Sequence, residues 1–387
     1  MKNKIYITSL HLMHGGVEMA ITALSNALVR RGYEVEILCT YNLGTPAYPL
    51  DSRVQVRYLT QVRPNREEFK QAVQQKNIPG IIREGLYAVR VLRLKKQVLI
   101  EQFRKIRSGV IISTRNEDSV LLSHYGNAGV RKIAQLHHDH CFDKKLLQDF
   151  KKHYKNIDIF TLLTDQLQEE VAEMMKNNHH TKCVTMPNFL PAGEEKAPNV
   201  TAENQVVAVG RLHPVKGFLR LIRLWKPVFE QTGTVLKIIG GGEQQEELEK
   251  EIAAQGLEDG VILTGSMEHD RVLEEMKKSI FYAMTSHSEG LPFVMIEAMS
   301  QGLPAIAYDV RVGPKAVIED GKNGFLTAED DEKAFAEKAV LLIKDPEKRA
   351  QMSSAALKRA NDFSEETVIA KWEALIDGKD DLRAENG

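Results

Sequence analysis

The sequence predicts an α/β protein built from two doubly wound domains. In each half of the 387-residue chain, short apolar strands alternate with helices, which is the pattern of a parallel sheet covered on both faces. A chain of this length is too long for one ordinary hydrophobic core. A polar, proline-bearing stretch at 191–204 separates the halves and fits an interdomain linker.

Short apolar segments mark the strands, with a turn of His14, Gly15 and Gly16 leading into a first helix at 17–29. In the first half we expect strands at 4–9, 34–39, 110–113 and 132–136. The second half restarts the pattern, with strands expected at 205–209, 235–239, 261–263, 280–284 and 305–308. A last helix begins after Ser364, a suitable cap, and carries Val368, Trp372 and Leu375 along one face.

The composition indicates a globular protein of a reducing compartment. Hydrophobic residues make up 43% and charged residues 27%, with no low-complexity run. The three cysteines, Cys39, Cys141 and Cys183, are far apart and in no metal-ligand spacing. The apolar run after Lys4 is too short for a signal peptide, and no stretch approaches the roughly 20 apolar residues that cross a bilayer. We therefore expect a cytoplasmic protein.

Charge is unevenly distributed along the chain. Residues 1–190 hold 28 Lys and Arg against 18 Asp and Glu, an excess of +10, and the remainder holds 24 against 35, an excess of −11. The basic excess is concentrated near 83–107, where Leu86, Val89, Leu92 and Leu94 interleave with the charges at near-helical spacing. Such a helix either lies on an anionic membrane surface or turns its apolar stripe to the core and leaves a solvated basic face.

The stretch from Ser286 to Met299 is the most informative for function. Glu289 stands in a turn, Gly290 and Pro292 open an apolar helix, and Glu297 lies inside that helix. The free amide groups and the dipole of the first turn suit a phosphate, and Glu297 leans back toward the same pocket as Glu289. The alternative is a surface turn before a core helix, but a carboxylate in so apolar a helix is costly without a partner. We expect a ligand with central phosphates and hydroxyl-rich sugars at both ends, which is a sugar nucleotide.

Two glycine-bounded loops follow strands of the second half. The first runs from Gly210 to Gly217 and contains Arg211 and Lys216, a forked donor and a point charge that can converge on a diphosphate, although lone surface cations are common. The second is the Gly240-Gly241-Gly242 turn. This turn and Gly15-Gly16 lie between a strand and a helix, where α/β sheets open ligand crevices, but turns that need positive φ are the commoner explanation.

These motifs together resemble the retaining glycosyltransferases of family four, which have the GT-B fold. The resemblance rests on Gly15-Gly16-Val17-Glu18, on Gly210-Arg211 with Lys216, and on Glu289 paired with Glu297. It implies two Rossmann-like domains facing across a cleft, with the last helix crossing back to the first domain. Residues 1–190 with 364–387 then form the acceptor-binding domain and 205–363 the nucleotide-sugar domain. The stretches at 308–315 and 319–326 are similar to bacterial enzymes that glycosylate teichoic-acid-type or other surface polymers.

The resemblance also implies roles for single residues. Arg211 and Lys216 neutralise the donor diphosphate, Glu297 holds the ribose hydroxyls, and Glu289 contacts the transferred sugar. The donor-binding set further contains Gly15, Gly16, Gly241, Gly290 and Leu291. The family places a histidine at the end of a first-domain strand, for which His137 is the best match and His138 an alternative.

The cluster from His137 to His140 also invites a metal interpretation. Nothing at suitable spacing completes a closed site around it, and Arg211 and Lys216 already supply the positive charge that a metal would bring. We expect no metal or other cofactor. A histidine that bonds a sugar hydroxyl is the preferred interpretation, and a structural role is the alternative.

The expected function is therefore metal-independent retaining transfer of a hexose from a nucleoside-diphosphate sugar, with UDP favoured, to a glycan, surface-polymer or lipid-linked acceptor. No nucleic-acid partner is expected. The alternatives are a UDP-sugar epimerase on the same fold and a catalytically silent subunit that binds a partner.

Overall fold

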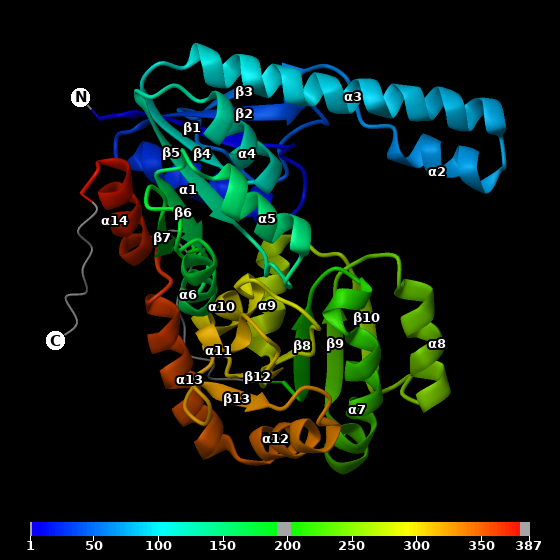
Figure 1. Ribbon diagram of the computed structural model, residues 1–387. Coiled ribbons are helices and arrows are strands. Elements are labelled where there is room, and N and C mark those ends of the chain that lie inside the picture. The colour runs from blue at the N-terminus through cyan, green and yellow to red at the C-terminus, as the bar shows by residue number, and fades with distance from the viewer. Residues whose placement is uncertain (1, 192–202, 380–387) are drawn as a thin grey trace. The chain divides into compact units, whose positions relative to one another are not determined.

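A computed structural model of the chain describes residues 2–191 and 203–379. The chain forms two compact α/β units, shown in Figure 1. The first contains Met1–Leu163, Leu167–Met186 and Ile369–Gly387, and the second contains Thr164–Gln166 and Pro187–Val368. Most of the expected linker, 192–202, and the end of the tail, 380–387, lie outside the described residues.

The first unit is built on a seven-stranded sheet in the order β3-β2-β1-β4-β5-β6-β7, in which every paired strand is parallel. Its strands are β1 (Lys4–Ser9), β2 (Glu34–Tyr41), β3 (Gln55–Thr60), β4 (Gly109–Ser113), β5 (Val130–Leu136), β6 (Ile159–Leu162) and β7 (Lys182–Thr185). The central strands are rich in Ile and Val, and Ile5, Ile7, Ile111 and Ile112 are completely buried. Burial on both faces is what a sheet of parallel strands requires.

The second unit has a six-stranded parallel sheet in the order β10-β9-β8-β11-β12-β13. Its strands are β8 (Gln205–Val209), β9 (Val235–Ile239), β10 (Val261–Gly265), β11 (Tyr282–Met284), β12 (Ala305–Tyr308) and β13 (Gly324–Thr327). Trp225, Phe281 and Phe335 are among the largest side chains of its core. This strand order is that of a doubly wound nucleotide-binding domain.

Helices cover the sheets. Those of the first unit are α1 (Gly16–Arg30), α2 (Arg66–Gln74), α3 (Ile78–Lys105), α4 (Asn116–Tyr125) and α5 (Lys144–His153), together with α6 (Asp165–Met174) from Leu167 and α14 (Glu365–Ile376) from Ile369. Those of the second unit are the 3₁₀ turn η1 (Pro214–Lys216), α7 (Phe218–Thr232), α8 (Gln245–Gln255), α9 (His269–Lys278), α10 (Phe293–Ser300), α11 (Pro314–Val317), α12 (Glu332–Lys344) and α13 (Pro346–Asn361).

The last helix carries the chain back to the first unit, as expected. Val368, Trp372 and Leu375 are buried. The Lys2 ammonium lies 3.1 Å from a Glu373 carboxylate oxygen, and the Arg131 guanidinium donates to the Leu375 carbonyl at 2.7 Å. Both bonds tie α14 to elements of the first unit. The prediction of a helix that crosses back is therefore confirmed.

Candidate active site

The centre of the second sheet is where a ligand crevice is expected. β8 and β11 are neighbours, and from them the chain winds outward in opposite directions, to β9 and β10 on one side and to β12 and β13 on the other. In open α/β sheets, ligands bind outside the carboxyl ends of the strands at such a switch point. The loop after β8 contains Arg211 and Lys216, and the loop after β11 contains Glu289.

The glycines at 240–242 support the loop that follows β8. The Leu212 amide donates to the Gly241 carbonyl at 2.9 Å, and the Gln244 amide donates to the Leu212 carbonyl at 3.1 Å. A Cβ atom at Gly240 would lie 1.9 Å from the Gly210 carbonyl oxygen. Two backbones approach each other this closely only where one of them has no side chain. The glycine turn therefore fixes the course of the Arg211 loop.

Lys216 and Glu289 form the central contact of the site. The Lys216 ammonium lies 2.7 Å from a Glu289 carboxylate oxygen, although the two residues are 73 positions apart. The Glu289 side chain is only 11% exposed and that of Lys216 is 31% exposed. The ammonium group has three donors, and this contact uses one of them. The remaining donors are available to an anion at the carboxyl ends of β8 and β11.

Arg220 holds the two loops against each other. Its guanidinium donates to the carbonyls of Thr285 at 2.6 Å and Ser286 at 2.7 Å, and also to carboxylate oxygens of Glu329 and Asp330. Gly217 lies beneath this contact, with φ of 65° and with its carbonyl accepting from the Thr285 hydroxyl. Sequence reasoning missed Arg220, because nothing in the sequence of α7 separates a buried arginine from a solvated one.

Both acids lie around one buried tyrosine. Burial raises the pKa of Tyr282, and the negative charges of Glu289 and Glu297 raise it further. The Tyr282 hydroxyl donates to the Val209 carbonyl at 3.3 Å, at the end of β8. Glu297 is 4% exposed, and one of its carboxylate oxygens lies 3.8 Å from the His269 imidazole. Both carboxylates thus lie close enough to Tyr282 to act on its hydroxyl electrostatically, and their joint role at a ligand stays a prediction.

The first turn of α10 offers unused amide groups. The N–H groups of Gly290, Leu291, Phe293 and Val294 donate no hydrogen bond within the described part of the chain. Pro292 has no N–H and precedes the helix, which begins one residue later than the sequence indicated. Such orphan donors at the positive end of a helix favour a phosphate.

The structure does not join Arg211 to the other site residues. Its side chain is exposed and makes no hydrogen bond or ion pair with the residues that the structure describes. Of the four charged residues expected to act together, Lys216 and Glu289 are in direct contact, and Glu297 acts electrostatically on Tyr282 beside them. Arg211 shares the loop with Lys216, and its role stays a prediction.

In the first unit, His137 directly follows β5. Neither ring nitrogen has a hydrogen-bond partner among the described residues, although both are buried. Burial, followed by the charge of His138, lowers the pKa of His137 to about 4, so the ring is neutral at pH 7. A buried imidazole without partners costs free energy, which a ligand hydroxyl would recover. His138 is exposed, and its ring already bonds the Asp139 carbonyl at 2.8 Å. Of the two candidates, His137 is the better placed to bind a ligand, because both of its ring nitrogens lack a partner among the described residues.

His140 has a structural task. Its Nε2 atom lies 2.9 Å from a Glu170 carboxylate oxygen, and its Nδ1 atom accepts from the Phe142 amide at 3.1 Å. The two bonds fix the ring and the loop that follows, where Cys141 and Phe142 both have positive φ. Among the described residues, no three His, Cys, Asp or Glu side chains are grouped so as to hold a metal ion.

The lowered pKa of His137 predicts a loss of stability in mild acid. Between pH 6.5, near which an unfolded histidine titrates, and about pH 4, the unfolded chain takes up a proton that the folded chain does not. The contribution of the neutral ring to the free energy of unfolding is therefore fully present above pH 6.5 and decreases as the pH falls toward about 4. From pH 7 to pH 5 we expect the wild type to lose about 2 kcal/mol more than a His137→Gln variant. Melting temperatures at both pH values check this, and equal losses in the two proteins would contradict it.

The Gly15-Gly16 turn opens α1. Gly15 is extended rather than left-handed, and a Cβ atom there would lie 2.1 Å from a Glu18 carboxylate oxygen. Glu18 is buried and lies 3.6 Å from the His11 imidazole. The Glu18 side chain therefore folds back over Gly15 and would have to move if position 15 carried a side chain, whereas the φ of Gly15 does not itself require glycine.

Comparison with known proteins agrees with this architecture. Residues 192–359 match the family described as glycosyl transferases group 1. The chain is 28% identical over 369 residues to the amylovoran biosynthesis glycosyltransferase AmsD of Erwinia amylovora, which covers 94% of this chain and 96% of the relative. It is 26% identical, with the same coverage, to an alpha-1,4-N-acetyl-D-galactosaminyltransferase of Campylobacter jejuni whose name includes a glycan on PP-undecaprenol.

A third relative is the poly(glycerol-phosphate) alpha-glucosyltransferase of Bacillus subtilis, which is 25% identical over 232 residues, 59% of this chain and 34% of that protein. Among solved structures, HepE of Anabaena in complex with UDP has a TM-score of 0.73 at 17% identity, covering 97% of this chain and 100% of that one.

The fold and these relatives define the class: the chain is a glycosyltransferase with the GT-B fold. Its segment 192–359 matches the glycosyl transferases group 1, and the relatives include an amylovoran biosynthesis glycosyltransferase and a poly(glycerol-phosphate) alpha-glucosyltransferase. The predicted resemblance to glycosyltransferases with the GT-B fold is confirmed.

Proposed function

We propose that the chain transfers a hexose, with retention of anomeric configuration, from a UDP-sugar to a growing bacterial surface glycan. The observation that carries the proposal is the Lys216–Glu289 pair beside the unused amides of α10, at the switch point of the second sheet. This arrangement offers a cation and N–H donors to a diphosphate and two carboxylates to hydroxyl groups. A nucleoside-diphosphate sugar has these groups in the same order.

In the proposed reaction, the bond between the anomeric carbon and the diphosphate oxygen breaks, and a bond from an acceptor hydroxyl forms on the same face. The acceptor proton passes to the departing diphosphate. Lys216 and the α10 amides stabilise the negative charge that grows on the leaving group, and Arg211 adds its charge from the same loop. Contacts that strengthen as charge develops lower the barrier. Two relatives are named alpha-transferases, the outcome that retention gives from an alpha-linked donor.

The remaining roles follow from the chemistry of the groups. Glu289 bonds hydroxyls of the transferred hexose, Glu297 bonds the ribose, and the neutral His137 ring bonds a sugar hydroxyl. Gly15 and Gly16 allow the backbone of the first unit to approach the donor. The charge that a divalent metal would supply comes from Lys216 and Arg211, so we propose that catalysis needs no metal.

The acceptor is proposed to be a surface polymer or a lipid-linked glycan, by analogy with the named relatives. No helix in the described part of the chain is long and apolar enough to cross a membrane. Three free cysteines fit a reducing compartment, and we place the reaction in the cytoplasm, at the inner face of the cell membrane.

The test is a panel of UDP- and GDP-sugars incubated with the purified protein, first alone and then with polyol-phosphate, polysaccharide and lipid-linked acceptors. Slow release of UDP without acceptor and faster transfer with one are expected. NMR spectroscopy of the product reports the anomeric configuration, and chelation by EDTA should leave the rate unchanged. An isomerised sugar without acceptor would indicate an epimerase instead. No turnover with any donor would indicate a silent subunit.

Glu297 should govern recognition of the nucleotide. A Glu297→Gln variant keeps the shape of the side chain and removes the charge, so the KM for the donor should rise about tenfold or more while kcat changes little. Binding of UDP and 2′-deoxy-UDP, measured by calorimetry, separates this role from a structural one. The wild type should prefer UDP, and the variant should lose most of that preference. An unchanged preference would place the ribose elsewhere.

A further inference from the structure

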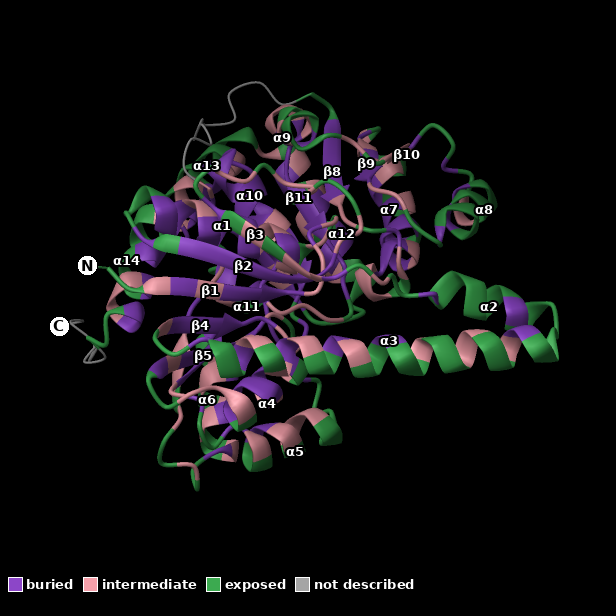
Figure 2. Cartoon of the chain, turned by 90° about the horizontal axis from the view of Figure 1, so that it is seen from above, coloured by how far each residue is buried: buried purple, intermediate pink, exposed green. Residues whose placement is uncertain are grey.

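Exposed apolar side chains gather on one element of the first unit. Of the eleven large hydrophobic side chains that are exposed in the described part of the chain, eight lie on α2 and α3. They are Phe69, Val73, Ile78, Ile82, Leu86, Tyr87, Val89 and Leu92. We call α2 and residues 78–92 of α3 the hairpin. Figures 1 and 2 show that it extends beyond the sheet of its own unit.

The long helix α3 carries two separate apolar stripes. Toward its C-terminal end, Val91, Leu99 and Phe103 are buried in the unit, and between them the buried Lys95 pairs with Glu117. Toward its N-terminal end, the stripe of Ile78, Ile82, Leu86, Val89 and Leu92 recurs every three or four residues and is exposed, with Leu86 at 69%. The core therefore accounts for the first stripe and leaves the second without a partner. Of the two alternatives that the sequence left open, an apolar stripe turned to the core is wrong for residues 78–92, and the membrane alternative stays a prediction.

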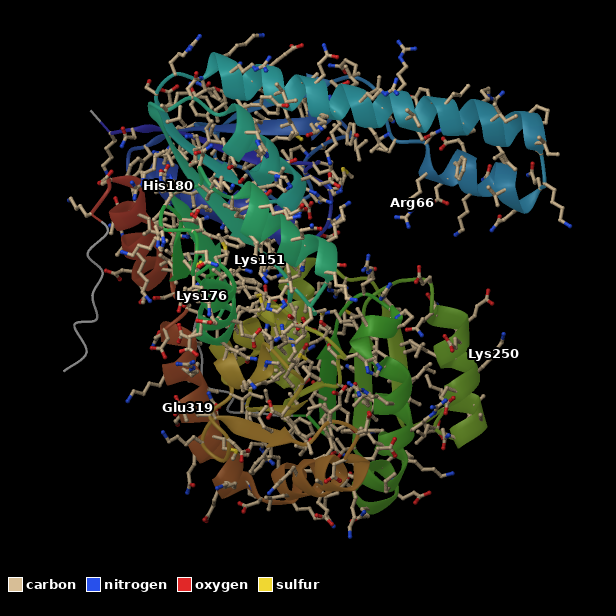
Figure 3. The ribbon with its side chains drawn as sticks, viewed as in Figure 1. Arg66, Lys151, Lys176, His180, Lys250 and Glu319 are labelled. Atoms are coloured by element: carbon tan, nitrogen blue, oxygen red, sulfur yellow. The ribbon has the colours of Figure 1, made fainter. Side chains whose placement is uncertain are left out.

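The hairpin is also basic. Residues 66–92 hold five Lys and Arg and three Glu, an excess of +2, and the exposed Arg93 and Lys96 follow on α3, whereas Lys95 is buried and paired with Glu117. Arg83 and Arg90 flank the exposed stripe. Arg93 and Lys96 extend the row of cations toward the C-terminal end of α3. Figure 3 shows the Arg66 side chain extending from α2 into solvent. Of the three acids, Glu84 is already paired, with Arg83.

We infer that the hairpin is the element that docks this protein on an anionic lipid membrane, with the exposed stripe in the acyl-chain boundary and the flanking cations against lipid phosphates. The apolar side chains at helical spacing match the acyl chains of such a membrane, and the neighbouring cations match its anionic headgroups. An acidic protein partner would explain the charge but not five large apolar side chains in one stripe. The inference locates the membrane association proposed above on α2 and the first half of α3, rather than on 83–107 as a whole.

Co-sedimentation of the full chain with phospholipid vesicles tests the inference. Binding is expected to vesicles that contain phosphatidylglycerol and not to vesicles of phosphatidylcholine alone. It should weaken as salt rises from about 0.1 M to about 1 M, because the Debye length shrinks from ~10 Å to ~3 Å. The Ile82→Ser/Leu86→Ser and Arg90→Gln/Arg93→Gln variants should each lower the partition coefficient roughly tenfold or more.

Two matched controls test whether the loss of any exposed leucine, or of any two surface cations, would lower vesicle binding in the same way. Leu341→Ser removes an exposed leucine of α12, and Lys250→Gln/Lys344→Gln removes two exposed cations outside the hairpin, of which Lys250 extends outward from α8 in Figure 3. Neither control should change vesicle binding. Control variants that lose as much binding as the hairpin variants, or wild-type protein that ignores anionic vesicles, would overturn the inference.

The inference and the proposed activity fail in different ways. All hairpin variants should keep wild-type turnover on a water-soluble acceptor, since none of the changed residues lies at the ends of β8 and β11. Turnover without vesicle binding would remove the docking role alone, and vesicle binding without turnover would remove the activity alone. A concentration-dependent dimer that Leu86→Ser abolishes, seen by analytical ultracentrifugation, would assign the stripe to a second copy of the chain and contradict the membrane.

Discussion

A Lys216→Ala variant is expected to lose a factor of about 10² or more in kcat for sugar transfer. The ammonium group is held 2.7 Å from Glu289 at the carboxyl ends of β8 and β11, where the proposed diphosphate departs. Its charge is worth most when the leaving group carries most negative charge, so the loss should appear in kcat more than in KM. Steady-state kinetics at saturating donor measures this.

A second Lys–Glu pair of the same unit provides the control. Lys237 lies 2.7 Å from Glu275, and the exposed fractions of the two side chains, 23% and 16%, are similar to those of the first pair. Lys237→Ala removes a comparable ion pair away from the switch point. The two variants should have similar melting temperatures, and only Lys216→Ala should lose turnover. Equal activity in both would show that Lys216 has no role in the reaction.

The strand pattern could be predicted from the sequence because parallel strands are continuous apolar runs. The segments at 4–9, 205–209, 235–239 and 305–308 match the observed strands residue for residue. The strands that were not predicted are β3, β6, β7 and β13, most of them short and lying toward the edges of the sheets. β3 reads Gln-Val-Arg-Tyr-Leu-Thr, with polar residues breaking the run, so its apolar pattern is weak.

The site was partly predictable for a different reason. Glu289 and Glu297 are close in sequence, in a turn and in the helix that follows it, so their position on one side of the sheet could be anticipated from the sequence. The contact of Lys216 with Glu289 depends on the order of strands in the sheet, which brings β8 beside β11. A strand order cannot be derived from apolar periodicity. The same limit hid Arg220 and Tyr282, whose partners lie on other elements.

An Arg220→Met variant is expected to destabilise the second unit by about 3 kcal/mol. The guanidinium is 9% exposed and lies over the Tyr308 ring at 4.6 Å. Its removal would leave the Thr285 and Ser286 carbonyls without their donor, and each unsatisfied buried group costs about 1–3 kcal/mol. Glu329 and Asp330 are 43% and 74% exposed, so the loss of their ion pairs adds little.

The two tryptophans allow the second unit to be followed alone. Trp225 belongs to the core of the second unit and Trp372 to the first, so a Trp372→Phe background leaves Trp225 as the only fluorescence reporter. Urea unfolding then gives the midpoint of the second unit with and without Arg220→Met. Arg223→Met is the matched control, because Arg223 lies three residues later on α7 and pairs with Glu251 at an exposed position.

Such an exposed pair contributes about 0–1 kcal/mol, so Arg223→Met should shift the midpoint little. A shift for Arg220→Met no larger than that of Arg223→Met would show that Arg220 does not hold the loops after β8 and β11 together. The activity of the folded Arg220→Met protein tests whether Arg220 also positions the side chains of the site. If Arg220 positions Lys216 and Glu289, the kcat of Arg220→Met should be lower than that of the wild type at urea concentrations at which the variant is still folded. Arg220→Lys should not restore kcat, because one ammonium group cannot reach two carbonyls and two carboxylates at once.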